Sequence, residues 1–330
     1  MPVDGFSSVT VYTAKGYVEA PEDAISVNNV TAKRNKDGSM TMPRVNAAPR
    51  PVAQPGSIGA KGWSLGALCW LCAIAASLSA PGARAESSAE DLAKTLANPV
   101  AAMISLPLQL NWDGDIGPDD AGDRLALNVQ PVVPFSLNDD WNVISRTILP
   151  ILHQSDVFPG SGSQTGLGDT VQSFFFSPKA PTAGGWIWGA GPVLLLPTGT
   201  DDLLSARKWA AGPTGVVLKQ RGPWTYGALA NHLWSFAGDG DRSDVDATFV
   251  QPFVTYTTPT AWSFSATIES TYDWEHDQLS LPVNLVASKV TKIGRQLVSF
   301  GGGVRYWVDS PDSGSEGVGL RLSMTLLFPR

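Results

Sequence analysis

From residue 103 onward, apolar and polar side chains alternate with a period of two. The clearest run is 262–274, in which aromatic and aliphatic residues occupy one face and mainly hydroxyl and carboxylate residues occupy the other. Such alternation is typical of a β-strand with one apolar face, because successive side chains point to opposite sides of a strand. The only helical pattern after residue 85 is 87–97, which Ser87 or Ser88 can cap and which Asn98-Pro99 ends.

The same period recurs along the chain and predicts about twelve strands. They are separated by clusters of Gly, Asp, Ser and Pro, which are turn and loop compositions. Six of them carry more Gly or Pro, or have mixed faces: 140–150, 170–178, 186–196, 208–219, 223–236 and 247–258. The other six alternate more cleanly: 104–112, 123–133, 262–274, 278–288, 295–307 and 317–328.

Three features favour a membrane barrel over a soluble β-protein. Several runs reach the length that a tilted strand needs to cross a bilayer. In 262–274 and 223–236 the aromatic residues gather at both ends of the apolar face, as expected where a strand crosses two headgroup layers. The clean apolar faces also lack charged residues. We therefore predict an all-β fold, a transmembrane antiparallel up-and-down β-barrel over 101–330, with its apolar faces toward lipid and its polar faces toward the lumen.

An export signal precedes this region. The apolar run 63–80 follows Lys61 and is followed by the small-residue site Ala83-Arg84-Ala85. A basic residue, a short apolar core and such a site are the parts of a secretory signal peptide, which we place at 61–85 with cleavage near Ala85. A single membrane-spanning helix is the alternative, because the run is close to the minimum length for a span.

The segment before the signal peptide, 1–60, has two explanations. It is either a disordered leader, or the start is assigned too early and Met40 or Met42 is the true start. After cleavage, residues 86–100 form a short N-terminal helical segment in front of the barrel. We exclude the segments before residue 86 from the fold argument.

Composition and charge narrow the class of protein further. A hydrophobic content of 43% excludes a chain that is disordered throughout. The single long apolar run excludes a polytopic helical membrane protein. A net charge of −7 argues against a nucleic-acid partner. Cys69 and Cys72 both lie in the predicted signal peptide, so the exported chain has no cysteine for a disulfide or a metal site.

Candidate catalytic or metal-binding chemistry is sparse. The three histidines are His153, His232 and His276, and only His276 has carboxylates close by, in YDWEHDQ. This string could hold a divalent cation, but an acidic turn between two strands is the simpler interpretation. The glycines of SFGGG (299–303) fit a strand that relieves crowding inside a barrel. No phosphate loop or dinucleotide motif occurs, and no G-x-S-x-G string occurs after the predicted signal peptide, so we expect no enzyme, no metal and no cofactor.

The residues that would matter in a pore are the polar ones on the inward faces. A pore selects solutes by the size, charge and hydrogen bonding of its lining. We predict that nine residues line the lumen and contact a passing solute: Gln109, Asn111, Asn128, Gln130, Thr267, Glu269, Asn284, Arg305 and Arg321. A purely structural role is the alternative, in which Glu269 pairs with an arginine across the lumen.

Several strings resemble a known family in their order along the chain. They are NPVAAMISLPLQLNWDGDIGP (98–118), LALNVQPVVPFSL (125–137), GLGDTVQSFFFSPK (166–179), WTYGALANHLWSFAGDG (224–240), VQPFVTYTT (250–258) and MTLLFPR (324–330). Together they resemble the outer-membrane "transporter" family grouped with the meta-pathway phenol-degradation proteins, often mislabelled neuromedin U. The resemblance covers 90–330 and implies a porin-like barrel that takes up aromatic or other hydrophobic compounds.

We therefore expect a channel in the bacterial outer membrane for small hydrophobic or aromatic compounds. Its partners would be outer-membrane lipid, these solutes and the outer-membrane assembly machinery, with no nucleic acid and no cofactor. Two alternatives remain at this point: a barrel with a structural or adhesive role and no transport, and a soluble periplasmic β-protein.

Overall fold

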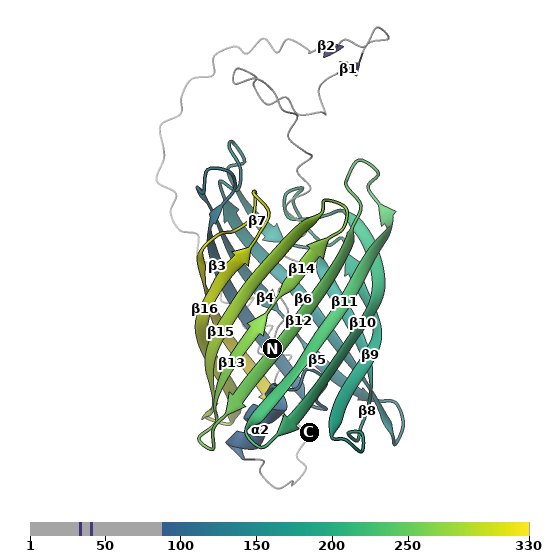
Figure 1. Ribbon diagram of the computed structural model, residues 1–330, viewed down its shortest axis with the longest axis vertical. Helices are drawn as coiled ribbons and strands as arrows, with labels where there is room; N and C mark the ends of the chain where they lie inside the picture. The colour runs from purple at the N-terminus through teal and green to yellow at the C-terminus, as the bar shows by residue number, and fades with distance from the viewer. Residues whose placement is uncertain (1–32, 35–39, 42–87, 330) are drawn as a thin grey trace. The chain divides into compact units, whose positions relative to one another are not determined.

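The computed structural model describes residues 33–34, 40–41 and 88–329 (Figure 1). Strands β1 (Lys33–Arg34) and β2 (Met40–Thr41) pair with each other in the predicted leader and form a unit of their own. The predicted signal peptide at 61–85 lies outside the described residues. The leader, its start and the cleavage site therefore stay predictions.

The larger unit is almost entirely antiparallel sheet. It begins with helix α2 (Ala89–Leu96). The strands that follow are β3 (Ile104–Ile116), β4 (Gly122–Val129), β5 (Val132–Ser136), β6 (Trp141–Ser155), β7 (Ser163–Leu167), β8 (Thr170–Pro178), β9 (Trp186–Leu196), β10 (Lys208–Arg221), β11 (Trp224–Gly238), β12 (Asp246–Thr257), β13 (Trp262–Ile268), β14 (Ser270–Asp273), β15 (Gln278–Ile293), β16 (Gln296–Asp309) and β17 (Val318–Phe328).

The sheet closes on itself because the last strand, β17, pairs with the first, β3. Three of the twelve spanning strands are interrupted, so that β4 and β5, β7 and β8, and β13 and β14 each form one crossing. A proline lies opposite each interruption. The N–H groups of Gln130, Gly168 and Glu269 bond to the carbonyls of Pro107, Pro150 and Pro282, respectively. Proline has no N–H to return, so the ladder is broken locally. The prediction of a twelve-stranded antiparallel barrel is confirmed.

The apolar faces point outward, as predicted. Ile268 is 38% exposed and Leu322 is 59% exposed, whereas the preceding residues Thr267 and Arg321 are buried. Exposed aromatic residues occupy both ends of the outward face, with Trp262 at one end of its crossing and Trp274 at the other. This exterior suits a hydrocarbon layer between two headgroup regions, and a closed ring leaves no strand edge unpaired in that layer.

The helix predicted at 87–97 is confirmed as α2. Ser88 caps it by accepting a hydrogen bond from the N–H of Asp91 at 3.0 Å. Its apolar side, with Leu92 and Ala93, packs against Val290 and Leu327 on the inner face of the barrel. In Figure 1 the helix lies at the barrel end with the shorter turns, which is the periplasmic end in outer-membrane barrels. No helix in the described ranges is long and apolar enough to cross a membrane.

The strand boundaries differ from the prediction mainly at the longer loops. The sequence predicts no strand between 150 and 170 and treats the Gly- and Ser-rich string FPGSGSQTGLGD (158–169) as a loop, which is wrong for β7, residues 163–167. This strand has no periodic apolar side chain to reveal it. It pairs with β6 and is joined to β8 through a bulge at Gly168-Asp169, where the register shifts by one residue.

Candidate functional site

All nine residues predicted on the inward faces lie inside the barrel. Each is at most 4% exposed: Gln109, Asn111, Asn128, Gln130, Thr267, Glu269, Asn284, Arg305 and Arg321. They come from β3, β4, β13, β15, β16 and β17 and from the two proline-broken positions after β4 and β13. Strand alternation is sufficient to explain this placement, because each residue is in phase with its neighbours on the polar face.

An ion pair organises this polar wall. The guanidinium of Arg321 donates two hydrogen bonds to the carboxylate of Glu269, both at 2.9 Å. Its Nε donates to Asn111 Oδ1 at 2.8 Å, and Gln251 donates to Glu269 at 3.4 Å. The two charges are thus bidentate and hydrogen-bonded on their remaining sides, which is the geometry that makes a buried pair tolerable. The sequence-based alternative, that Glu269 pairs with an arginine, is realised with Arg321.

A second charged pair lies beside the first. Arg305 Nε is 3.4 Å from Asp113 Oδ1, and the indole N–H of Trp307 donates to the same oxygen at 2.9 Å. The guanidinium carbon of Arg305 also lies 5.0 Å from the centre of the Trp307 ring. Sequence reasoning missed Asp113 because it sits in an acidic loop composition, although its position two residues after Asn111 places it on the same inward face.

Two further arginines from the neighbouring strands extend the polar wall. Arg124 Nε donates to Gln154 Oε1 at 3.2 Å, and Arg146 donates to Gln130 Oε1 at 3.3 Å. Both arginines and Gln154 are buried. They were not among the predicted residues, yet Arg124 is in phase with Asn128. Arg146 belongs to a strand with mixed faces, where alternation did not show which side was inward.

The opposite wall is apolar, which corrects the expectation of a uniformly polar interior. Strands β6 and β8–β12 supply most of a single cluster of buried apolar side chains: Val100, Ile144, Ile148, Val171, Phe175, Val193, Leu195, Ala206, Ala210, Val216, Leu218, Leu229, Leu233, Val245, Phe249 and Phe253. These strands carry apolar residues on both faces, so their mixed patterns gave no direction. The interior therefore has one wall rich in hydrogen-bonding and charged groups, and one wall in which apolar side chains predominate over a few buried polar ones such as Thr214 and Asn231.

The loop between β9 and β10, residues 197–207, folds inward over the extracellular half. Leu204 is fully buried and packs against Ala126 of β4 and Leu152 of β6. The carboxylate of Asp169 holds this loop by accepting hydrogen bonds from the hydroxyl of Ser205 and the N–H of Ala206, each at 2.7 Å. Leu204 of this loop thus fills part of the interior beside β4 and β6.

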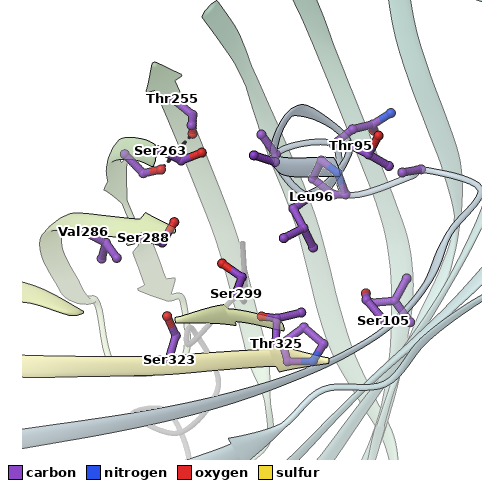
Figure 2. Close-up of a pocket in the computed structure, with 18 of the residues that line it drawn as sticks. Thr95, Leu96, Ser105, Thr255, Ser263, Val286, Ser288, Ser299, Ser323 and Thr325 are labelled. Atoms are coloured by element: carbon purple, nitrogen blue, oxygen red, sulfur yellow. Dashed lines mark hydrogen bonds between the residues drawn. The ribbon is translucent and has the colours of Figure 1, made fainter. Parts of the chain in front are cut away.

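A cavity remains between the polar wall and α2, with a volume of about 130 Å³. Leu96 and Ala97 of the helical segment and Met103 form its apolar side. Hydroxyl groups on the facing strands form the other side: Ser105, Thr255, Ser263, Ser265, Thr267, Ser288, Ser299, Ser323 and Thr325. Figure 2 shows several of these hydroxyl side chains lying around the same space as Leu96. Gln109, Gln130, Arg146 and Arg321 also line the cavity.

The helix that bounds this cavity is tethered to the apolar half of the barrel. The side chain of Gln220, at the end of β10, donates to the backbone carbonyl of Lys94 at 2.8 Å. Val100, which follows the helix, belongs to the apolar cluster. The N-terminal segment therefore crosses the short-turn end and contacts both walls.

The histidines form local contacts only. His276 lies in the turn between β14 and β15, where Asp273 accepts hydrogen bonds from its ring and from its backbone N–H. His232 faces outward and is bonded to Thr248 at 2.7 Å on the adjacent strand. Within the described ranges, no group of three or more His, Cys, Asp or Glu side chains could hold a metal ion.

Comparisons with known proteins agree with the barrel architecture. No protein-family profile matches the chain, and no curated protein matches it. Among solved structures, the chain is similar to the COG4313 outer membrane channel from Pseudomonas putida F1, with a TM-score of 0.56 and 15% identity over 76% of this chain and 100% of that one. The β domain of the Bordetella autotransporter BrkA scores 0.41 at 14% identity over 69% and 100% of the two chains. In fold, the chain is a closed twelve-stranded β-barrel of the bacterial outer-membrane kind.

Proposed function

We propose that the protein is a passive outer-membrane channel for small hydrophobic or aromatic compounds. The observation that supports this most is the two-faced interior, in which a wall of buried apolar side chains faces a wall of amides, hydroxyls and paired charges. A compound with an apolar body and one polar group can keep contact with both walls at once. A uniformly polar lumen would exclude its body, and a uniformly apolar one would leave its polar group unpaired.

The polar side of the pathway would be the nine residues predicted from the sequence. Glu269 and Arg321 neutralise each other and Arg305 lies beside Asp113, so these two pairs offer hydrogen bonds without a net charge. Uncharged solutes are favoured under this arrangement, because an ion would have to shed water without gaining a free counter-charge. Passage would follow the seam between the walls and would require side chains there to rearrange, since most are fully buried. The step needs no cofactor, only a concentration difference.

The test is solute entry into liposomes that carry the purified, refolded chain. Ser299→Trp fills the cavity from the inner face of β16, whereas Phe300→Trp changes the adjacent, outward residue, which is 43% exposed. We expect uptake of a small aromatic solute by the wild type and by Phe300→Trp, and a large loss in Ser299→Trp. Heat-modifiable gel mobility verifies that each variant folds. Absence of uptake and of single-channel conductance in the wild type would contradict the proposal.

A second function is favoured by one observation. The fully buried apolar residues of the interior, including Ile144, Leu218 and Phe249, form a packed core such as a non-transporting structural or adhesive barrel would have. Conductance separates the two functions, because a structural barrel stays closed under all voltages while a channel opens. We favour the channel because a permanently filled barrel does not require the cavity or its hydroxyl wall.

A further inference from the structure

Two buried polar atoms of residues that line the cavity have no hydrogen-bond partner in the described part of the chain. They are the side-chain oxygen Oε1 of Gln109 and the side-chain nitrogen Nε2 of Gln130. Both side chains are fully buried and both line the cavity beside α2. Buried amide groups are nearly always hydrogen-bonded, because an unpaired one has lost its water without replacement. These two atoms therefore indicate a ligand that completes the cavity.

The orientation of each amide follows from its neighbours. The guanidinium of Arg321 has only donors, so the side-chain oxygen of Asn111 accepts its hydrogen bond. Gln109 therefore directs its side-chain nitrogen toward the same oxygen, with 3.4 Å between Gln109 Nε2 and Asn111 Oδ1. This leaves the oxygen of Gln109 directed away from Asn111. Likewise, Arg146 can only donate, so it takes the oxygen of Gln130 and leaves the nitrogen free. The cavity thus offers one acceptor and one donor, each fixed by an arginine.

The acceptor and the donor are close enough to serve one small molecule. Gln109 pairs with Asn128 across the β3–β4 ladder, and Gln130 lies two residues further on the same inward face. Diagonal neighbours of this kind are about 7–8 Å apart at their backbones, within the reach of two glutamine side chains. The carbonyl of Pro107 accepts the N–H of Gln130 at 2.9 Å, which holds the strands together at this point.

We propose that the cavity binds an uncharged compound of about one six-membered ring that carries a hydroxyl group. The hydroxyl donates a hydrogen bond to Gln109 Oε1 and accepts one from Gln130 Nε2. The apolar body of the compound lies against Leu96, Ala97 and Met103. The cavity, about 130 Å³, is close to the roughly 150 Å³ of an engineered cavity that binds benzene. This rests on the proposed function, since it assigns a binding station on the same pathway.

The chemistry discriminates among close analogues of one ring. A methyl ether can accept from Gln130 but gives nothing to Gln109. An ammonium group can donate to Gln109 but confronts the donor of Gln130. Each mismatch leaves one buried polar atom unpaired, which corresponds to about a tenfold loss of affinity. Benzyl alcohol, benzyl methyl ether and benzylammonium test the three cases.

Gln130→Glu is the decisive variant. The carboxylate keeps an oxygen for Arg146 but replaces the free donor by an acceptor, so two acceptors then face the ligand. The matched control is Gln154→Glu, which makes the same change beside Arg124, where the amide oxygen accepts at 3.2 Å outside the cavity. Both glutamines are fully buried and both accept a hydrogen bond from an arginine. The amide nitrogen of Gln154 also donates to Gln164 Oε1 at 3.1 Å, so the control loses one hydrogen bond that Gln130→Glu does not.

Binding is measured by saturation-transfer NMR titration of the full chain refolded in detergent, with protein-free micelles subtracted. We expect the wild type and Gln154→Glu to bind benzyl alcohol about tenfold more tightly than the ether or the ammonium compound. Gln130→Glu should reverse the order in favour of benzylammonium. Equal binding of alcohol and ether by the wild type, no binding above the micelle background, or the same reversal in Gln154→Glu would each overturn the site.

The liposome assay tests the channel function independently of the binding site. Uptake by the wild type without discrimination between alcohol and ether would overturn the binding site and leave the channel intact. Discrimination in the NMR titration without uptake or conductance would overturn the channel and leave a ligand site in a closed barrel.

Discussion

Ile268→Arg places a charge at mid-depth on the outward face of the barrel. Ile268 lies six residues from Trp262 and six from Trp274, which mark the two ends of its crossing. At about 3.3 Å per residue and a tilt of about 40°, six residues correspond to about 15 Å along the membrane normal. Ile268 is therefore at the bilayer midplane, where the cost of a basic residue is greatest.

The expected cost of Ile268→Arg is about 2–4 kcal/mol, the value for a basic side chain at the midplane. This lowers the folding equilibrium constant roughly 30-fold to 900-fold. The matched control is Val318→Arg, which also replaces an exposed β-branched residue but lies at the first position of β17, next to a loop. There the cost should be only about 0–1 kcal/mol, because the charge reaches the headgroup region.

The assay is reversible urea unfolding of the chain in lipid vesicles, followed by tryptophan fluorescence. Assembly in cells should follow the same order, with Ile268→Arg accumulating unfolded and Val318→Arg reaching the membrane. Equal stability of the two variants, or an unchanged midpoint for Ile268→Arg, would refute the assignment of this face to lipid.

Three further outcomes are expected. Glu269→Gln leaves the buried guanidinium of Arg321 without its carboxylate and should cost about 3–5 kcal/mol in vesicle unfolding, with a shift of reversal potential toward anions. Leu92→Glu puts a charge into the buried side of α2, so the helix should detach, become sensitive to protease and raise single-channel conductance. The hydrogen bond from Lys208 holds the pKa of Asp244 below its ordinary value of 3.8. That contact stabilises the loop 239–245 above this pH and is lost as the pH falls through the depressed pKa. Amide hydrogen exchange in the loop should therefore accelerate in acid. In Asp244→Asn this acid-induced acceleration should be absent.

Alternation along the chain was sufficient to predict the barrel wall where the two faces differ clearly. On β13 and β17, for example, Ile268 and Leu322 point outward, and Thr267 and Arg321 point inward, as the period of two requires. The same phase placed all nine predicted polar residues inside the barrel. This works because a strand in a closed barrel has only two environments, lipid and interior, and a one-residue shift exchanges them completely.

Alternation failed where both faces are apolar. On β10, Leu218 and Ala210 are buried inside the barrel, while Val217 and Trp209 are exposed outside. Because both faces are apolar, the sequence pattern does not show which face points inward. The hydrocarbon half of the interior could not be recognised from such a strand. Its existence depends on several strands of this kind lying side by side, which is a property of the closed sheet.

The sequence by itself thus determined the class of fold, the number of crossings and the inward polar positions, because strand periodicity is a local property. Only the tertiary structure decided which groups meet across the interior. Glu269 and Arg321 are 52 residues apart in sequence, and α2 lies beside strands near the other end of the chain. The unpaired atoms of Gln109 and Gln130 follow from contacts with Asn111 and Arg146, which occupy the other ends of their amides. Such contacts are set by the curvature and closure of the barrel, and no local pattern encodes them.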